Sequence, residues 1–265
     1  MSNSVGLEHL GLILGNAQHI GRRRDQQDAF GCSDLTDQAF VRHGGVLAVV
    51  ADGIGGLARG DLASRCAVET FLAAYREKTV AETVAEMLER ALHRSQEAVR
   101  EMGIKLQAED NIGSTLIAAV MTGDGVQWIS VGDSALLRLN QDGLAQLNHA
   151  HIFARRLEQA VARGVLSVED AMSNPNREAL TSYLGCEELT EIDSSPGPLQ
   201  CAPGDRLLLC SDGLYRVLEP DEIIAQLRTE AEPQAACDAL VGAVIGKNRE
   251  HQDNVTVMCI SVEEK

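Results

Sequence analysis

Aspartates at the ends of apolar segments are the residues whose type and spacing could do chemistry. Asp52 and Asp212 each end an apolar run and precede a glycine, Asp253 comes directly before another apolar run, and Asp28 follows three arginines in GRRRDQQDAFG. A single aspartate in such a place is often a turn former or a helix cap. If the two runs that end in Asp-Gly are neighbouring strands, however, their carboxylates share one crevice and need a cation between them to stay ionised. Oxygen ligands without His or Cys favour hard cations such as Mg²⁺ or Mn²⁺.

A burst of glycines follows Asp52 in the stretch VLAVVADGIGGLARG, residues 46–60. Its pattern Gly53-x-Gly55-x-x-Ala58 is similar to a dinucleotide cradle, in which backbone N–H groups hold a pyrophosphate. Asp52 stands at the mouth of this turn, and its carboxylate would repel a phosphate unless a cation lies between them. The surrounding elements must therefore distinguish dinucleotide binding from metal binding.

The elements around the glycines argue against the dinucleotide cradle. Residues 46–51 form a Val-rich run typical of a strand that is buried on both faces, and 61–76 is predicted to be a helix with Asp61 as its N-cap. A second helix is predicted to end at Gly103, from apolar residues that recur on one face. These residues are Val80, Val84, Met87, Leu88, Ala91, Leu92, Ala98, Val99 and Met102. Two long helices in succession break the βαβ pattern that a dinucleotide fold requires.

The rest of the chain alternates between predicted strands and helices. Four strand-like segments, in part separated by turns that favour antiparallel hairpins, are 113–121, 125–133, 134–140 and 144–148. Residues 149–185 are polar and mostly helical, with a break at Asn174-Pro175. Strands at 206–213 and 253–262 and helices at about 220–228 and 233–247 complete the prediction. Because there is no internal repeat and no linker, one domain is the economical interpretation.

Composition limits the possible partners and compartments. The chain has 265 residues, 45% of them hydrophobic but only 3% aromatic, so aliphatic side chains must fill the core. A formal net charge of −16 argues against a nucleic-acid partner. Seven cysteines without a Cys-x-x-Cys pair suit a reducing cytosol. No apolar run reaches the roughly 18 residues that span a bilayer, and the N-terminus does not read as a secretory signal, so we expect no membrane contact.

Taken together, the motifs resemble those of the metal-dependent protein phosphatases of type 2C, in their bacterial form. The matching fragments, in chain order, are RRDQQDAF (23–30, with the first residue Arg23), ADGIGG (51–56), GSTL (113–116), VGDS (131–134), LTSYLG (180–185), SDGL (211–214) and DNVT (253–256). The resemblance implies an α+β fold, a four-layer α-β-β-α sandwich of two mainly antiparallel sheets flanked by helices. It also implies a single domain over 1–265, with a segment at about 148–190 that we call the flap segment.

The resemblance also implies the residues of the site. Two core metal ions, Mn²⁺ or Mg²⁺, would be held by Asp28, Asp52, the backbone carbonyl of Gly53, Asp212 and Asp253, with Asp52 bridging both ions. Asp110 matches the position that, together with Asp212, holds a weaker third metal, although a solvated loop acid is the alternative. Arg23 resembles the arginine that holds the substrate phosphate, and its planar fork suits such contact.

The implied activity is that of a metal-dependent protein serine/threonine phosphatase, in which a metal-bridging hydroxide hydrolyses phosphoserine and phosphothreonine monoesters. The partners would be phosphorylated proteins, substrates of a serine/threonine kinase, in cytoplasmic signalling. We expect a monomer. The alternative is a catalytically weak scaffold or interaction protein on the same fold.

Several positions depart from the family pattern. Gln26 replaces the usual Asn, and Ala135 replaces the Arg that often follows Gly-Asp-Ser. Asn148 and Asn174 stand where bacterial relatives usually have Asp and His, so the flap segment is expected to behave differently. Ile54 occupies a position that is His in some members. None of these changes removes a metal ligand that the resemblance implies.

Overall fold

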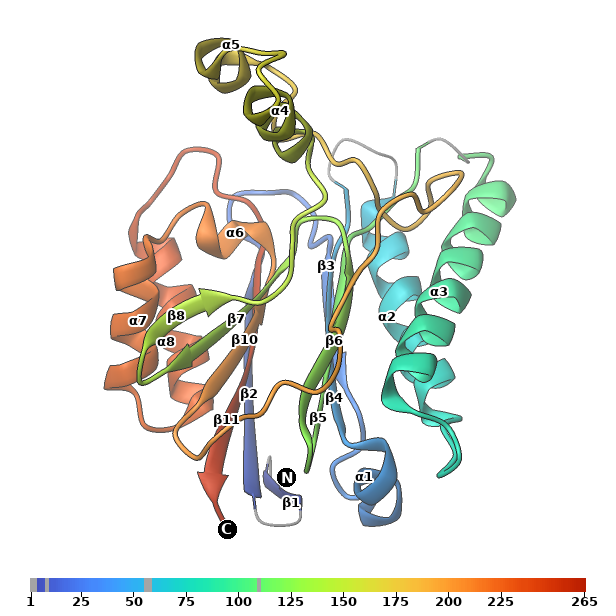
Figure 1. Ribbon diagram of the computed structural model, residues 1–265, viewed down its shortest axis with the longest axis vertical. Coiled ribbons are helices and arrows are strands. Elements are labelled where there is room, and N and C mark those ends of the chain that lie inside the picture. The colour runs from blue at the N-terminus through green and yellow to red at the C-terminus, as the bar shows by residue number, and fades with distance from the viewer. Residues whose placement is uncertain (1–3, 8–9, 55–58, 109–110) are drawn as a thin grey trace.

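Two β-sheets packed face to face form the centre of the molecule in the computed structural model, which describes residues 4–7, 10–54, 59–108 and 111–265. One sheet has the strand order β1-β2-β11-β10-β7-β8 and the other has the order β3-β4-β5-β6-β9. Helices α7 and α8 cover the outer face of the first sheet, and α2 and α3 cover that of the second (Figure 1). The predicted four-layer α-β-β-α sandwich is thus confirmed.

The bounds of the elements follow the chain through both sheets. The first sheet consists of β1 (Ser4–Leu7), β2 (Leu10–His19), β11 (Val255–Glu264), β10 (Arg206–Cys210), β7 (Ala135–Asn140) and β8 (Gly143–Gln146). The second consists of β3 (Asp28–Cys32), β4 (Val46–Asp52), β5 (Leu116–Thr122), β6 (Gly125–Val131) and β9 (Asp193–Ser194). The helices are α1 (Gln38–Gly44), α2 (Gly60–Arg76), α3 (Val84–Leu106), α4 (Phe153–Ala162), α5 (Val168–Ser173), α6 (Asp212–Tyr215), α7 (Pro220–Thr229) and α8 (Pro233–Gly246). In the described part of the chain, no helix combines the length and the apolar character that crossing a membrane requires.

Aliphatic side chains fill three cores, as the low aromatic content predicts. Leu209 and Met258 lie in the core between the two sheets. Phe71 and Tyr75 of α2 lie in the core between the second sheet and its helices. Leu240 lies in the core between the first sheet and the C-terminal helices. Strand β4 therefore faces one core on each side, which explains its unbroken apolar run.

The predicted N-cap of α2 is wrong. Asp61 lies in the first turn of the helix, and the N-cap position is taken by Arg59, whose left-handed φ of 60° turns the chain into the helix. The reason is tight packing at the helix start: a Cβ atom on Gly60 would lie 3.0 Å from the carbonyl carbon of Gly53. Contact with the end of β4 thus fixes where α2 begins.

The boundaries of α3 also differ from the prediction. Val80 is exposed and lies before the helix, which begins after Thr83. The Thr83 hydroxyl accepts a hydrogen bond from the N–H of Glu86, whose carboxylate accepts one from the N–H of Thr83. This capping box fixes the start. At the other end the helix continues through Gly103, which is buried, to Leu106.

The strand predictions are confirmed for β4, β5, β6, β7, β8, β10 and β11, with shifts of a few residues at their ends. The β5–β6 and β7–β8 pairs are antiparallel hairpins, as the turns predict. Between Val131 and Ala135, however, the chain crosses from one sheet to the other. Gly132 makes this crossing with a φ of +93°, and a Cβ atom there would lie 2.6 Å from the side chain of Thr115. The segments from 113 to 148 are therefore two hairpins in different sheets.

Strands β1, β2 and β3 near the N-terminus were not predicted. The ten residues of β2 pair along their whole length with β11. Strand β3 pairs with β4. The strand before the Arg22–Arg24 cluster, β2, therefore belongs to the first sheet, and the strand after it, β3, belongs to the second sheet. This cluster lies in the connection between the two sheets at one end of the sandwich.

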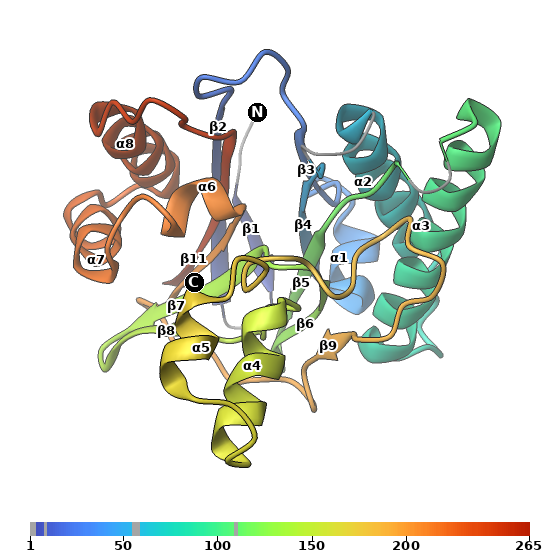
Figure 2. The ribbon, with the colours of Figure 1, turned by 90° about the horizontal axis from the view of Figure 1, so that it is seen from above.

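The flap segment stands out from the sandwich. Helices α4 and α5 project beyond the ends of the sheets, on the side where α6 lies (Figure 1), and Figure 2 shows them in front of both sheets. The base of the segment is fixed by His151, whose N–H donates to the carbonyl of Gly132 and whose Nδ1 accepts from the N–H of Gly132. Asn148 is buried beside it, accepts from the N–H of Leu136 and donates to the carbonyl of Ser134. Asn148 thus serves as a fully hydrogen-bonded anchor.

Candidate metal centre

Asp28 and Asp52 come together at the end of the sandwich. They are register partners on the antiparallel strands β3 and β4, and directly opposed residues lie on the same face of a sheet. Asp28 is buried, and its Oδ2 accepts hydrogen bonds from the hydroxyls of Ser211 (2.8 Å) and Thr256 (2.7 Å). Its Oδ1 is also buried but receives no hydrogen bond from the described residues. A buried carboxylate oxygen left in this way calls for a cation or a proton.

The charges of the four predicted aspartate ligands act on one another. Burial, and after it the neighbouring charge of Asp28, raises the pKa of Asp52 well above its ordinary value, with smaller contributions from Asp212 and Asp253. Burial also raises the pKa of Asp28. For Asp212, burial and then the charge of Asp133 raise the pKa to about 7. Carboxyl groups that oppose one another's ionisation in this way fit a site for divalent cations, which would stabilise all of them in the charged form.

Arginines are the present partners of the two outer aspartates. Nη2 of Arg23 lies 2.5 Å from Oδ2 of Asp253, and Nε of Arg216 lies 2.8 Å from Oδ2 of Asp212. Among the described residues, no group of three or more His, Cys, Asp or Glu side chains stands in an arrangement that could hold a metal ion. The fold thus brings the four predicted aspartates to one place, whereas their role as ligands stays a prediction.

Gly53 follows Asp52 where β4 turns toward α2. Its N–H donates to the carbonyl of Gln27, and the carbonyl of Asp52 accepts from the N–H of Thr115. A Cβ atom on Gly53 would lie 2.2 Å from the carbonyl oxygen of Gly60 and would collide with it. Glycine is therefore required here by close backbone contact, and its predicted role as a carbonyl ligand remains untested. The other glycines of the pattern, Gly55 and Gly56, and Ala58 lie outside the described residues, as does Asp110.

The four aspartates Asp28, Asp52, Asp212 and Asp253 are called the acidic cluster below, and Arg23 lies at its rim. Its side chain is 48% exposed, and its Nη2 contacts Asp253. The hydrogen bond with Asp253 raises the pKa of Arg23, burial opposes this effect, and the charges of Asp253, Asp212 and Asp52 add to the increase. Arg22 points elsewhere, because its Nη2 donates to Oδ1 of Asn248. The structure thus gives these two neighbouring arginines different partners, and the phosphate-binding role of Arg23 stays a prediction.

Several residues at the site were missed by the sequence reasoning. Ser211 and Thr256 orient Asp28, and Asn254 fixes the loop before it by accepting from the N–H of Gln27 and donating to the carbonyl of Ile20. Each of the three lies inside a recognised fragment, SDGL or DNVT, so the signal was present. Their hydroxyl and amide groups are suited to supporting a carboxylate rather than to reacting.

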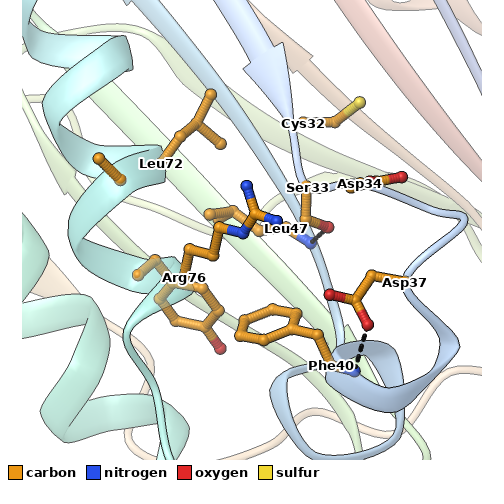
Figure 3. A pocket seen from close by; sticks show the side chains of 10 residues that line it. Cys32, Ser33, Asp34, Asp37, Phe40, Leu47, Leu72 and Arg76 are labelled. Atoms are coloured by element: carbon orange, nitrogen blue, oxygen red, sulfur yellow. Dashed lines mark hydrogen bonds between the residues drawn. The ribbon is translucent and has the colours of Figure 1, made fainter.

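A largely apolar cavity near β3 is separate from this centre. A cavity of about 300 Å³ lies at the Cys32 end of β3, beside α1 and α2, with Leu47, Leu72 and Phe40 along its wall (Figure 3). Asp28 lies at the opposite end of the same strand. Among the polar groups of the cavity, the Asp37 carboxylate already accepts from the N–H of Phe40. We therefore assign the cavity no part in the centre.

Comparison with known proteins agrees with the fold and the motifs. The family described as "Protein phosphatase 2C" matches residues 16–240. The chain is 34% identical over 245 residues to "Serine/threonine phosphatase stp" of Listeria innocua, and the match covers 85% of this chain and 93% of that protein. It is 27% identical over 249 residues to "Protein phosphatase PhpP" of Streptococcus pneumoniae, over 93% of this chain and 96% of that protein. Among solved structures, the PPM Ser-Thr phosphatase MsPP from Mycobacterium smegmatis, in complex with cacodylate, has a TM-score of 0.71 at 29% identity, over 94% of this chain and 97% of that one.

Proposed function

The chain belongs to the protein phosphatase 2C family and is a metal-dependent protein serine/threonine phosphatase, and we propose that its active centre is the cluster of Asp28, Asp52, Asp212 and Asp253. The observation that carries this proposal is the buried Oδ1 of Asp28, which receives no hydrogen bond from the described residues and lies beside the register partner Asp52. A catalytically weak scaffold on the same fold is not favoured. Such a protein would have no use for a costly group of mutually repelling carboxyls.

The carboxylate oxygens of the cluster are donors of the kind that Mn²⁺ and Mg²⁺ prefer. We propose that Asp28, Asp52, Asp212, Asp253 and the carbonyl of Gly53 hold Mn²⁺ or Mg²⁺. We further propose that Asp110 contributes to a third ion. When bound, such ions would stabilise charge on the phosphoryl oxygens and lower the pKa of water, so that hydroxide is available to attack phosphorus at neutral pH.

The chain's own residues have distinct parts in the reaction. Ser211 and Thr256 hold Oδ2 of Asp28, whereas its buried Oδ1 receives no hydrogen bond from the described residues. We propose that Arg23, which is half exposed, holds the oxygens of an incoming phosphate, for which a guanidinium offers paired donors. To do so it must share or release Asp253, so phosphate and Asp253 compete for the same donors.

The substrates are phosphoproteins. We propose more specifically that they are products of a serine/threonine kinase, that the chain acts as a monomer and as one domain over residues 1–265, and that the flap segment at about 148–190 borders the active centre. The cytoplasm is the compartment that we propose, because all seven cysteines are free thiols.

Hydrolysis of a phosphoserine peptide tests the proposed centre. The wild-type protein should release phosphate with Mn²⁺ and stop when a chelator is added, whereas Asp28→Asn should stay folded and lose both activity and Mn²⁺ binding. Exchange of Asp124, which lies in an exposed hairpin turn, for Asn provides a matched control that should retain both. Full turnover by Asp28→Asn would overturn the assignment of the centre.

A further inference from the structure

Arg216 joins the acidic cluster to the flap segment. It follows the short helix α6, and its guanidinium contacts carboxylates from different parts of the fold. Nε lies 2.8 Å from Oδ2 of Asp212, and Nη2 lies 3.0 Å from Oδ2 of Asp133 and 3.5 Å from Oε2 of Glu178. Asp212 and Asp133 belong to the sandwich, whereas Glu178 belongs to the flap segment.

Asp133 depends on Arg216 for its charge partner. This aspartate is only 6% exposed, and burial raises its pKa while the charge of Arg216 lowers it. Residue 135, which is often an arginine in the resembled family, is a buried alanine here. Arg216 thus delivers from α6 the positive charge that Ala135 cannot provide. The hydroxyl of Tyr215 strengthens the same junction by donating to the carbonyl of Asp133 at 3.0 Å.

On the flap side, Glu178 is part of a continuous chain of polar contacts. Its Oε1 accepts from Nε of Arg177 at 3.1 Å. Nη1 of Arg177 donates to the carbonyl of Ala171 in α5, and its Nη2 lies 4.0 Å from Glu158 of α4. Both flap helices are thereby connected to Arg216 through Arg177 and Glu178.

The contact with Asp212 creates a competition. A cation that takes Oδ2 of Asp212 must displace or share the N–H group of Arg216, and it must also approach a positive guanidinium. Any other carboxylate that attracts Arg216 weakens its contact with Asp212 and so makes cation binding at Asp212 more favourable. Glu178 is the one that belongs to the flap segment, whereas Asp133 lies in the turn between β6 and β7.

We propose that Arg216 is a positioning residue that competes with a divalent cation for Asp212, and that Glu178 of the flap segment sets the strength of this competition. The inference rests on the proposed function in taking Asp212 as a metal ligand. Because coupling between two sites is reciprocal, a cation at Asp212 also strengthens the contact between Arg216 and Glu178 and so holds the flap segment to the sandwich.

Calorimetric titration with Mn²⁺ alone tests the proposal without any measurement of activity. Arg216→Met should bind Mn²⁺ about tenfold more tightly than the wild type, since a repelling charge and a competing donor are lost. Glu178→Gln should bind it about threefold more weakly, and this effect should vanish when both changes are combined. Arg216→Lys, which keeps the charge with fewer donors, should lie between wild type and Arg216→Met. Glu187→Gln, an exposed acid of the same segment, serves as the control and should leave the affinity unchanged.

The outcomes separate this inference from the proposed function. Unchanged or weaker Mn²⁺ binding by folded Arg216→Met and Arg216→Lys would overturn it, as would an effect of Glu178→Gln that persists beside Arg216→Met. If Asp212→Asn binds Mn²⁺ as the wild type does, Asp212 is no ligand, and both the assigned centre and the inference fail. If binding requires Asp212 but ignores Arg216, only the inference fails.

Discussion

Asp28 and Asp52 are opposed in register across the antiparallel pair β3–β4, and Asp28 keeps one buried oxygen that receives no hydrogen bond from the described residues. The charge of Asp28 raises the pKa of Asp52, and burial raises the pKa of both carboxyl groups. Their proximity is therefore costly unless a cation joins them, and the predictions below follow from this relationship and its surroundings.

Loss of Asp52 should abolish turnover. Asp52→Ala removes the carboxylate whose pKa is raised by burial and by Asp28, and with it the proposed bridging ligand. We expect phosphopeptide hydrolysis to fall by several orders of magnitude, together with a weaker calorimetric response to Mn²⁺. Asp142→Ala, in the exposed β7–β8 turn, should change neither. Activity within an order of magnitude of wild type would contradict the bridging role.

Substitution of Arg23 and substitution of Arg22 should have sharply different effects on kcat/KM. Arg23 lies at the acidic cluster, whereas Arg22 contacts Asn248. Loss of a charge-assisted hydrogen bond of about 1.5–3 kcal/mol predicts a roughly 10- to 150-fold fall in kcat/KM for Arg23→Ala, mainly through KM. Steady-state kinetics on a phosphoserine peptide checks this. Arg22→Ala is the control, and equal losses in both variants would mean that the cluster acts through bulk charge alone.

The metal-free protein should lose stability as the pH rises from about 4 to about 7. The pKa of Asp212 is raised to about 7 in the folded state, above the ordinary value of about 3.9 that an unfolded chain would have. Within this window the folded state binds more protons than the unfolded state, so the free energy of unfolding decreases with pH. The pKa values of Asp28 and Asp52 are also raised, so both residues contribute to the same decrease in the free energy of unfolding with rising pH.

Thermal melting of chelated protein across that pH range measures the effect. The melting temperature should fall with rising pH, less steeply in Asp212→Asn, and saturating Mn²⁺ should offset the fall. A melting temperature that rises from pH 4 to 7 in the chelated wild type would be the wrong sign for this mechanism.

Gly53→Ala should destabilise the fold. The new methyl group would lie 2.2 Å from the carbonyl oxygen of Gly60 and 2.7 Å from that of Gln27, both of which are backbone atoms. We expect a loss of about 1–3 kcal/mol in the free energy of unfolding, measured with denaturant. Gly242→Ala in α8, where no atom lies within 4 Å of the added Cβ, should be neutral or stabilising because alanine favours helix. Equal stability of the two variants would contradict the close contact at Gly53.

Ile54→His should change the turnover of phosphopeptides more than that of aryl phosphates. Ile54 follows the Asp52-Gly53 turn, and its N–H donates to the carbonyl of Gly113. An imidazole there could protonate a departing alkoxide, help of a kind worth about 10²–10⁴-fold, whereas an aryl phosphate leaves as a stable phenoxide. The ratio of phosphopeptide to aryl phosphate turnover should rise, with a new pH-dependent limb near the imidazole pKa of about 6.5. An equal gain on both substrates would show that the imidazole does not act on the leaving group.

The buried strands and the identity of the acidic residues could be predicted from the sequence. Strands β4 and β10 are predictable from their apolar runs, because both of their faces are covered. Asp52 is the last residue of β4, and Asp212 comes two residues after the end of β10. The fragments around Asp28 and Asp253 complete the set by resemblance. These are local signals, so they need no knowledge of which segments meet in space.

Helix ends were less predictable, because contacts from outside the helix compete with local preference. Asp61 has the right chemistry for an N-cap, yet the packing of Gly60 against Gly53 moves the cap to Arg59. Strand β2 was missed because it carries glycines and polar residues, and its ten pairs with β11 stabilise it instead.

Only the tertiary structure decided which charges meet. The register that opposes Asp28 to Asp52 depends on the pairing of two strands, and the contact of Arg216 with Glu178 joins α6 to a segment far away in the chain. Such pairings depend on how the sheets stack and on where the chain crosses between them at Gly132, rather than on the preferences of neighbouring residues. The sequence by itself therefore predicted which acids form the proposed centre, and the packing of the two sheets and the flap segment determined which arginines contact Asp253 and Asp212.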